Sequence, residues 1–275
     1  MNTKQFGRTG RSVSEIGMGT YYDPLWITTG FAGWRRGHAA KVEAIKAGLE
    51  SGISLIDTAE IYQSEQLVAE AIKGAKRDEL FVATKVWSIH MHRDAVISSL
   101  EKSLRRLGTS YVDLYQIHFP SGRVPIEETM AAMEWLVSQG KVAALGVSNF
   151  GLEQVKEANA SLGKSQLASV QMPYNLLHRS IEQDLLPYCD QEGIAVMAYY
   201  PLAHGKLASA DPRIEELTAK YSKTQSQLAL RWLAQKKNVF PIPRASNSAH
   251  VQENVGASGW ELAPEDAARL EESFR

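Results

Sequence analysis

Four ionisable side chains in the first half of the chain stand at, or just after, the ends of apolar runs. They are Asp57, Tyr62, Lys85 and His118. A buried ammonium beside a phenol lowers the pKa of the phenol from about 10 towards neutrality, and a carboxylate keeps that ammonium charged. A histidine can hydrogen-bond the substrate oxygen that the phenol protonates. Together the four predict a general acid that donates a proton to a developing alkoxide, whereas any one of them alone is more readily explained by an ion pair with a neighbour.

Eight short apolar runs have the composition of buried strands. Several are apolar nearly throughout, as in FVAT, VDLYQI and IAVMAY, which is typical of strands covered on both faces in a parallel sheet. The runs are Ile16–Thr20, Ser54–Asp57, Leu80–Lys85, Val112–His118, Ala144–Ser148, Ala168–Gln171, Ile194–Tyr199 and Asn238–Ile242.

Segments with helical periodicity separate these runs. The stripe from Val96 to Leu107, for example, ends at Gly108, a typical helix C-cap. Strands and helices alternating about every 30 residues predict an α/β fold, a (β/α)8 TIM barrel, as a single domain over residues 1–275. An N-terminal β-hairpin around GRTG (7–10) is expected at the bottom of the barrel, and residues 22–38 are expected to form a long loop over its mouth. Barrels place their chemistry at the C-terminal ends of the strands, so the four ionisable groups can converge there.

Composition excludes several classes of function. Thirty Lys+Arg residues against 31 Asp+Glu give a net charge of −1, which leaves no electrostatic basis for binding nucleic acid or an anionic membrane. The single cysteine, Cys189, excludes an internal disulfide and a cysteine-based zinc cluster. The N-terminus lacks the apolar region of a signal peptide, so we expect a cytoplasmic protein. Neither a Rossmann nor a P-loop glycine motif is present.

Six segments resemble the signature blocks of the aldo-keto reductase family and occur in the family's order. They are LIDTAEIY (55–62), ATKVW (83–87), YVDLYQIHFP (111–120), GVSNF (146–150), VMAYYPLA (196–203) and IPRASNSAHVQEN (242–254). The resemblance spans nearly the whole chain. It implies NAD(P)H-dependent reduction of an aldehyde or ketone, with Tyr62 as the acid, Lys85 lowering its pKa, Asp57 anchoring Lys85 and His118 orienting the carbonyl.

The same resemblance implies a set of coenzyme-binding residues. Ser148, Asn149 and Gln171 match the contacts to the carboxamide, and Tyr199 matches the aromatic ring that stacks on the nicotinamide. The remaining matches are Pro201 and Leu202 beside the pyrophosphate, and Arg244, Ser246, His250, Glu253 and Asn254 around the adenosine. Asn149 could also cap the following helix.

Three positions depart from the family pattern. Arg244-Ala245-Ser246 replaces a common Lys-Ser, and His250 replaces a common arginine. Arg244 can still bind a 2′-phosphate, so we expect NADPH to be preferred, with NADH possible. Gln63 follows the tyrosine where relatives often have glycine, and this departure predicts nothing about function.

The resemblance places Tyr21, Trp87 and Phe119 in an apolar substrate pocket, to which Trp26, Phe31 or Trp34 could add. The expected partner is a small carbonyl compound, and the sequence does not indicate an oligomeric state. Two alternatives stay open. A regulatory subunit could keep the fold and coenzyme with little turnover. A metal-dependent hydrolase, suggested by His90 and His92, is weakly supported, and we expect no metal.

Overall fold

The computed structural model describes residues 1–209 and 211–274. Within them, eight parallel strands follow one another around a barrel in sequence order. Backbone bonds from Gly17 N to Pro241 O (2.9 Å) and from Gly19 N to Pro243 O (3.1 Å) join the first strand to the last and close it. The strands are β3 (Met18–Gly19), β4 (Leu55–Asp57), β5 (Phe81–Val86), β6 (Val112–Ile117), β7 (Val142–Ser148), β8 (Leu167–Pro173), β9 (Ala195–Tyr199) and β10 (Val239–Pro241). The predicted (β/α)8 barrel is confirmed.

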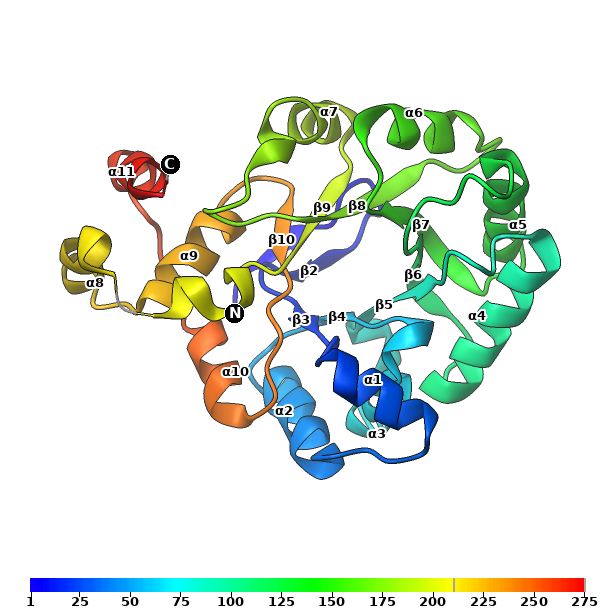
Figure 1. Cartoon of the computed structure of the whole chain (residues 1–275), viewed down its shortest axis with the longest axis horizontal. Coiled ribbons are helices and arrows are strands. Elements are labelled where there is room, and N and C mark those ends of the chain that lie inside the picture. Colours follow the sequence, from blue (N-terminus) through cyan, green and yellow to red (C-terminus); the bar gives the residue numbers. More distant parts are fainter. Residues whose placement is uncertain (210, 275) are drawn as a thin grey trace.

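Helices surround the ring of strands (Figure 1). They are α1 (Pro24–Phe31), α2 (His38–Glu50), α3 (Glu65–Ala71), α4 (Arg93–Leu107), α5 (Ile126–Ser138), α6 (Leu152–Ala160), α7 (Leu185–Glu192), α8 (Glu215–Tyr221), α9 (Gln225–Ala234), α10 (Ser248–Val255) and α11 (Pro264–Ser273). The stripe from Val96 to Leu107 is the buried face of α4, and Gly108 ends this helix with a φ of +64°.

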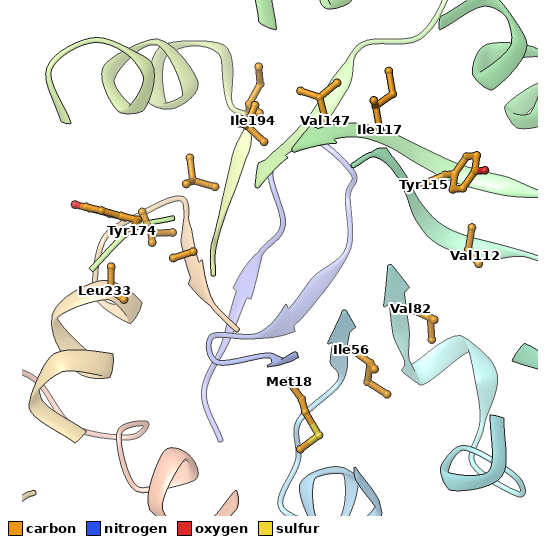
Figure 2. Close-up of a cluster of buried hydrophobic side chains, with 14 of the residues drawn as sticks. Met18, Ile56, Val82, Val112, Tyr115, Ile117, Val147, Tyr174, Ile194 and Leu233 are labelled. Carbon is orange, nitrogen blue, oxygen red and sulfur yellow. The ribbon is translucent and has the colours of Figure 1, made fainter. Parts of the chain in front are cut away.

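Successive side chains along each strand point to opposite faces of the sheet, which divides the core into two layers. In β4, Ile56 packs outwards against the helices, while Leu55 and Asp57 face the barrel interior. Figure 2 shows the outer layer, in which Ile56, Val82 and Ile117 lie between strands and helices. Apolar residues therefore fill the lower interior and leave polar residues at the C-terminal strand ends.

The predicted hairpin closes the N-terminal end of the barrel. Its strands are β1 (Thr3–Gln5) and β2 (Ser12–Ser14). Phe6 is fully buried, with its ring centroid 4.5 Å from that of Phe81 and 4.9 Å from that of Phe240. The hairpin and Phe6 close the N-terminal end of the barrel, so its open mouth lies at the opposite end.

The expectation of a long loop over residues 22–38 is wrong, because Pro24–Phe31 forms helix α1. The Asp23 side chain accepts a bond from Trp26 N (2.7 Å), and Pro24 occupies the first turn. An Asp-Pro pair is a helix-start signal that the glycine content of this stretch obscured.

Candidate active site

A buried ion pair lies at the C-terminal ends of β4 and β5. Lys85 Nζ donates to both carboxylate oxygens of Asp57 at 2.7 Å and to Thr58 O at 2.9 Å. Gln171 Nε2 also donates to Asp57 Oδ1, at 2.8 Å. Lys85 is fully buried and all three of its protons have acceptors, so the desolvated charges are well compensated.

Tyr62 stands above this pair on the 3₁₀ turn η1 (Glu60–Tyr62). Its hydroxyl lies 3.2 Å from Nε2 of His118, which follows β6. The Lys85 ammonium lies 4.8 Å from the centre of the Tyr62 ring. The structure thus brings Asp57, Tyr62, Lys85 and His118 together in one cluster, as the strand ends predicted.

The electrostatics of the cluster differ from the expectation in one respect. Burial, reinforced by the negative charge of Asp57, raises the pKa of Tyr62 well above its ordinary value. The predicted net lowering of this pKa is therefore wrong for the site as the structure presents it, because burial outweighs the stabilisation that the Lys85 ammonium gives to the phenolate. Burial, together with the charge of Lys85, lowers the pKa of His118 to about 2. At neutral pH the phenol is protonated and the imidazole is uncharged.

A cavity of about 370 Å³ opens over the cluster. Tyr21, Trp87 and Phe119 line it, as predicted. Its other lining residues are Gly19, Ile27, Asp57, Ile61, Tyr62, His118, Ser148, Asn149, Gln171, Tyr199, Tyr200, Pro201, Ile242 and Arg244. Most of these side chains are aromatic or aliphatic, which is typical of a site for a small organic molecule.

A second cavity, of about 340 Å³, adjoins the first. The two share Tyr21, Tyr200, Pro201 and Arg244. Further predicted coenzyme residues line the second cavity, namely Leu202, His250, Glu253 and Asn254, whereas Ser246 lines neither. Together the cavities form a cleft that runs from the ionisable cluster to helix α10.

Asn149 links three strand ends in the first cavity. Its side-chain amide donates to His118 O (2.9 Å) and Ser148 Oγ (3.1 Å), and its oxygen accepts from Tyr199 Oη (2.7 Å). The alternative role as a helix cap is wrong, because Gly151 occupies the N-cap position of α6. The residue also has a φ of +63°, a left-handed conformation that asparagine tolerates better than most residues.

Arg244 stands where the two cavities meet. Its Nη1 donates to Tyr22 O, and the residue lines both cavities. At the far end, Thr224 Oγ1 donates to the Glu253 carboxylate. Asn247 caps α10 by accepting from His250 N at 2.9 Å.

Sequence reasoning missed several lining residues and misplaced others. Ile27, Ile61 and Ile242 line the cavity, but single isoleucines give no signal in a sequence. Of the aromatic residues offered for the pocket, Trp26 is buried against Tyr62, and its Nε1 donates to the Tyr62 carbonyl at 3.1 Å. Phe31 and Trp34 are 66% and 63% exposed and do not line the cavity.

The two histidines after β5 are paired with carboxylates. His90 Nδ1 lies 2.9 Å from Glu60, and His92 Nδ1 lies 3.2 Å from Glu128. The residues that the structure describes contain no group of three or more His, Cys, Asp or Glu side chains placed to hold a metal ion. None of the helices described combines the length and the apolar character needed to cross a membrane.

Comparison with known proteins decides the family. The model of the aldo/keto reductase family matches residues 27–274. The chain belongs to this family. Methylglyoxal reductase YeaE of Escherichia coli (strain K12) is 37% identical over 270 residues, covering 96% of this chain and 92% of that protein. Glyoxal reductase of Bacillus subtilis (strain 168) is 33% identical over 248 residues, covering 90% and 87%.

A solved aldo-keto reductase has the same fold. The Klebsiella pneumoniae enzyme, crystallised in complex with NADPH, superposes with a TM-score of 0.88 at 34% identity, covering 100% of this chain and 96% of that one. The structural match covers the whole cleft and the cluster beneath it.

Proposed function

We propose that this aldo-keto reductase reduces aldehydes or ketones to alcohols with NADPH as the preferred coenzyme and Tyr62 as the general acid. The observation that carries the proposal is the position of Tyr62. Its hydroxyl meets His118 at 3.2 Å beneath a cavity of about 370 Å³ that adjoins a second one. Relatives named as methylglyoxal and glyoxal reductases support carbonyl reduction.

The chemistry of the cleft fits a nicotinamide coenzyme. Ser148, Asn149 and Gln171 gather hydroxyl and amide groups beside the Tyr199 ring, which suits a planar carboxamide-bearing ring. Arg244 supplies a fixed cation at the junction of the cavities, and a guanidinium can bind a phosphate through two charge-assisted bonds. When bound, NADPH supplies the hydride that reduces the carbonyl carbon.

The residues of the cluster divide the proton chemistry among them. The raised pKa keeps Tyr62 protonated, so the phenol has a proton to give as the substrate oxygen takes up negative charge. The tyrosinate left behind lies beside the Lys85 ammonium, 4.8 Å from the ring centre. Neutral His118, whose Nε2 lies 3.2 Å from the Tyr62 hydroxyl, would hydrogen-bond the same substrate oxygen. Lys85 therefore acts by stabilising the product of proton transfer, while Asp57 holds Lys85 in place.

The lining of the first cavity favours uncharged substrates. Among its described residues, Asp57 is already bound to Lys85, and Arg244 is the one cation. If Arg244 binds the coenzyme, no cation is left for a carboxylate on the substrate. We therefore propose neutral aldehydes and ketones, including small α-oxoaldehydes, as substrates.

The test is the loss of NADPH absorbance with matched neutral and anionic carbonyls, such as methylglyoxal and pyruvate. The proposal expects turnover of the neutral compound with kcat/KM at least tenfold above that of the acid. Binding of NADPH without turnover of any aldehyde in a panel would instead support a regulatory subunit. Turnover that requires added zinc would contradict the proposal.

A further inference from the structure

Helix α1 is attached to the turn that carries Tyr62. Trp26, which is 3% exposed, donates its indole proton to the Tyr62 carbonyl at 3.1 Å. One turn further along the helix, Gly30 lies directly over Gln63, and a Cβ at Gly30 would come within 2.8 Å of Gln63 Cβ. The helix thus contacts the turn through a hydrogen bond and through the close approach of the Gly30 backbone to the Gln63 side chain.

The turn itself is held in an unfavourable conformation. Gln63, the residue after Tyr62, has a φ of +57°, the left-handed region that favours glycine. Such conformations cost of order 1–3 kcal/mol and persist where the surroundings enforce them. The contacts of Gln63 with Gly30 and of the Tyr62 carbonyl with Trp26 are two such constraints.

The same helix forms part of the substrate cavity. Ile27, the residue after Trp26, lines the cavity over the ionisable cluster. Lys41 of α2 lies over the Trp26 ring, with its Nζ 4.5 Å from the ring centroid. Adjacent residues of α1 therefore contact the Tyr62 turn on one side and the substrate space on the other.

We propose that α1 is a clamp in which Trp26 is a positioning residue for Tyr62 and Ile27 is a specificity-determining residue for the substrate. The clamp fixes the position of the Tyr62 phenol relative to Lys85. A substrate that packs against Ile27 contacts the same helix that positions the acid. This inference rests on the proposed role of Tyr62.

Trp26→Phe tests the positioning role because it removes the indole proton and keeps an aromatic ring. Displacing a reacting group by about 1 Å can cost about 100-fold in rate, so a smaller shift of Tyr62 is expected to lower kcat about tenfold. The loss should be equal for a small and a bulky aldehyde, and the Kd for NADPH, measured by calorimetry, should stay within twofold. Ile27→Ala should instead raise KM more for the bulky aldehyde.

Trp260→Phe is a matched control. Trp260 Nε1 also donates to a backbone carbonyl at 3.1 Å, that of Gly256, and Lys223 also lies over its ring. The chemical change is the same, but it lies outside the cleft. This control should lose similar thermal stability while keeping the wild-type kcat.

Amide hydrogen exchange of the Tyr62–Gln63 turn gives a readout that does not depend on turnover. Tyr62 N is bonded to Ala59 O at 3.0 Å, and loosening the clamp should speed its exchange about tenfold in Trp26→Phe but not in Trp260→Phe. Gly30→Ala, which forces the helix off Gln63, should have the same effects on exchange and kcat.

Unchanged exchange and wild-type kcat in both Trp26→Phe and Gly30→Ala would overturn the clamp. Faster exchange with a wild-type kcat would overturn the positioning role. Failure of the proposed function would appear separately, as an active Tyr62→Phe enzyme, and would leave the exchange result to judge the clamp.

Discussion

Removing Lys85 should destabilise the protein through the charge it leaves behind. In Lys85→Met, Asp57 stays buried and keeps the Gln171 amide at 2.8 Å but loses both bonds to the ammonium. Breaking one side of a buried ion pair costs about 3–5 kcal/mol, because the remaining charge is uncompensated. At the usual unfolding entropy per residue, that loss lowers the Tm of a 275-residue chain by about 5–9 °C.

A double-mutant cycle separates this effect from lost packing. Equilibrium unfolding in urea is compared for wild type, Lys85→Met, Asp57→Leu and the double variant. The double variant should recover at least about 2 kcal/mol relative to the sum of the single losses, since no unpaired charge is left in it. If the two single losses add to within about 0.5 kcal/mol, the two charges are not coupled as the 2.7 Å contacts require.

Three further predictions concern the coenzyme, the substrate wall and pH. Arg244→Ala should weaken NADPH binding about 10- to 100-fold and leave NADH nearly unchanged, and equal weakening of both in calorimetry would count against a phosphate contact. Trp87→Ala should raise KM most for bulky apolar aldehydes, and equal changes for small and large aldehydes would exclude Trp87 from the substrate wall. The native pKa of about 2 for His118 lies below the unfolded value near 6.5, so the stability that it contributes is present above pH 6.5 and is lost as pH falls towards 2. The free energy of unfolding therefore falls by about 1.4 kcal/mol for each pH unit. In His118→Asn, its slope against pH between pH 6.5 and 4 should be smaller by about that value.

Much of the fold could be predicted because its signals are local and repeated. Apolar runs and helix-ending glycines such as Gly108 recur through the chain, and a barrel follows from their alternation. Helix α1 was not predicted, because three glycines within residues 22–38 favour an irregular segment. Gly30 is there for its close approach to Gln63, a tertiary contact that a pattern along one chain does not reveal.

The site was predictable where topology alone places residues. Asp57, Lys85 and His118 converge because parallel strands end at one edge of the barrel. The pKa of Tyr62 was not predictable, since its direction depends on how deeply the phenol is buried and on how closely Asp57 offsets Lys85. The strain at Gln63 was also hidden, because no pattern along the chain marks a positive φ at a glutamine.

A single-turnover experiment on Tyr62→Phe tests the central claim most directly. Enzyme in excess over NADPH is mixed with methylglyoxal, and coenzyme oxidation is followed by absorbance, with the Kd for NADPH measured on the same variant. Loss of the acid should slow the step by roughly 10²–10⁴-fold. The Kd should change by less than twofold, because the ring and the cleft remain. A rate within a fewfold of wild type would contradict the assignment of Tyr62 as the acid, and with it the mechanism proposed for this enzyme.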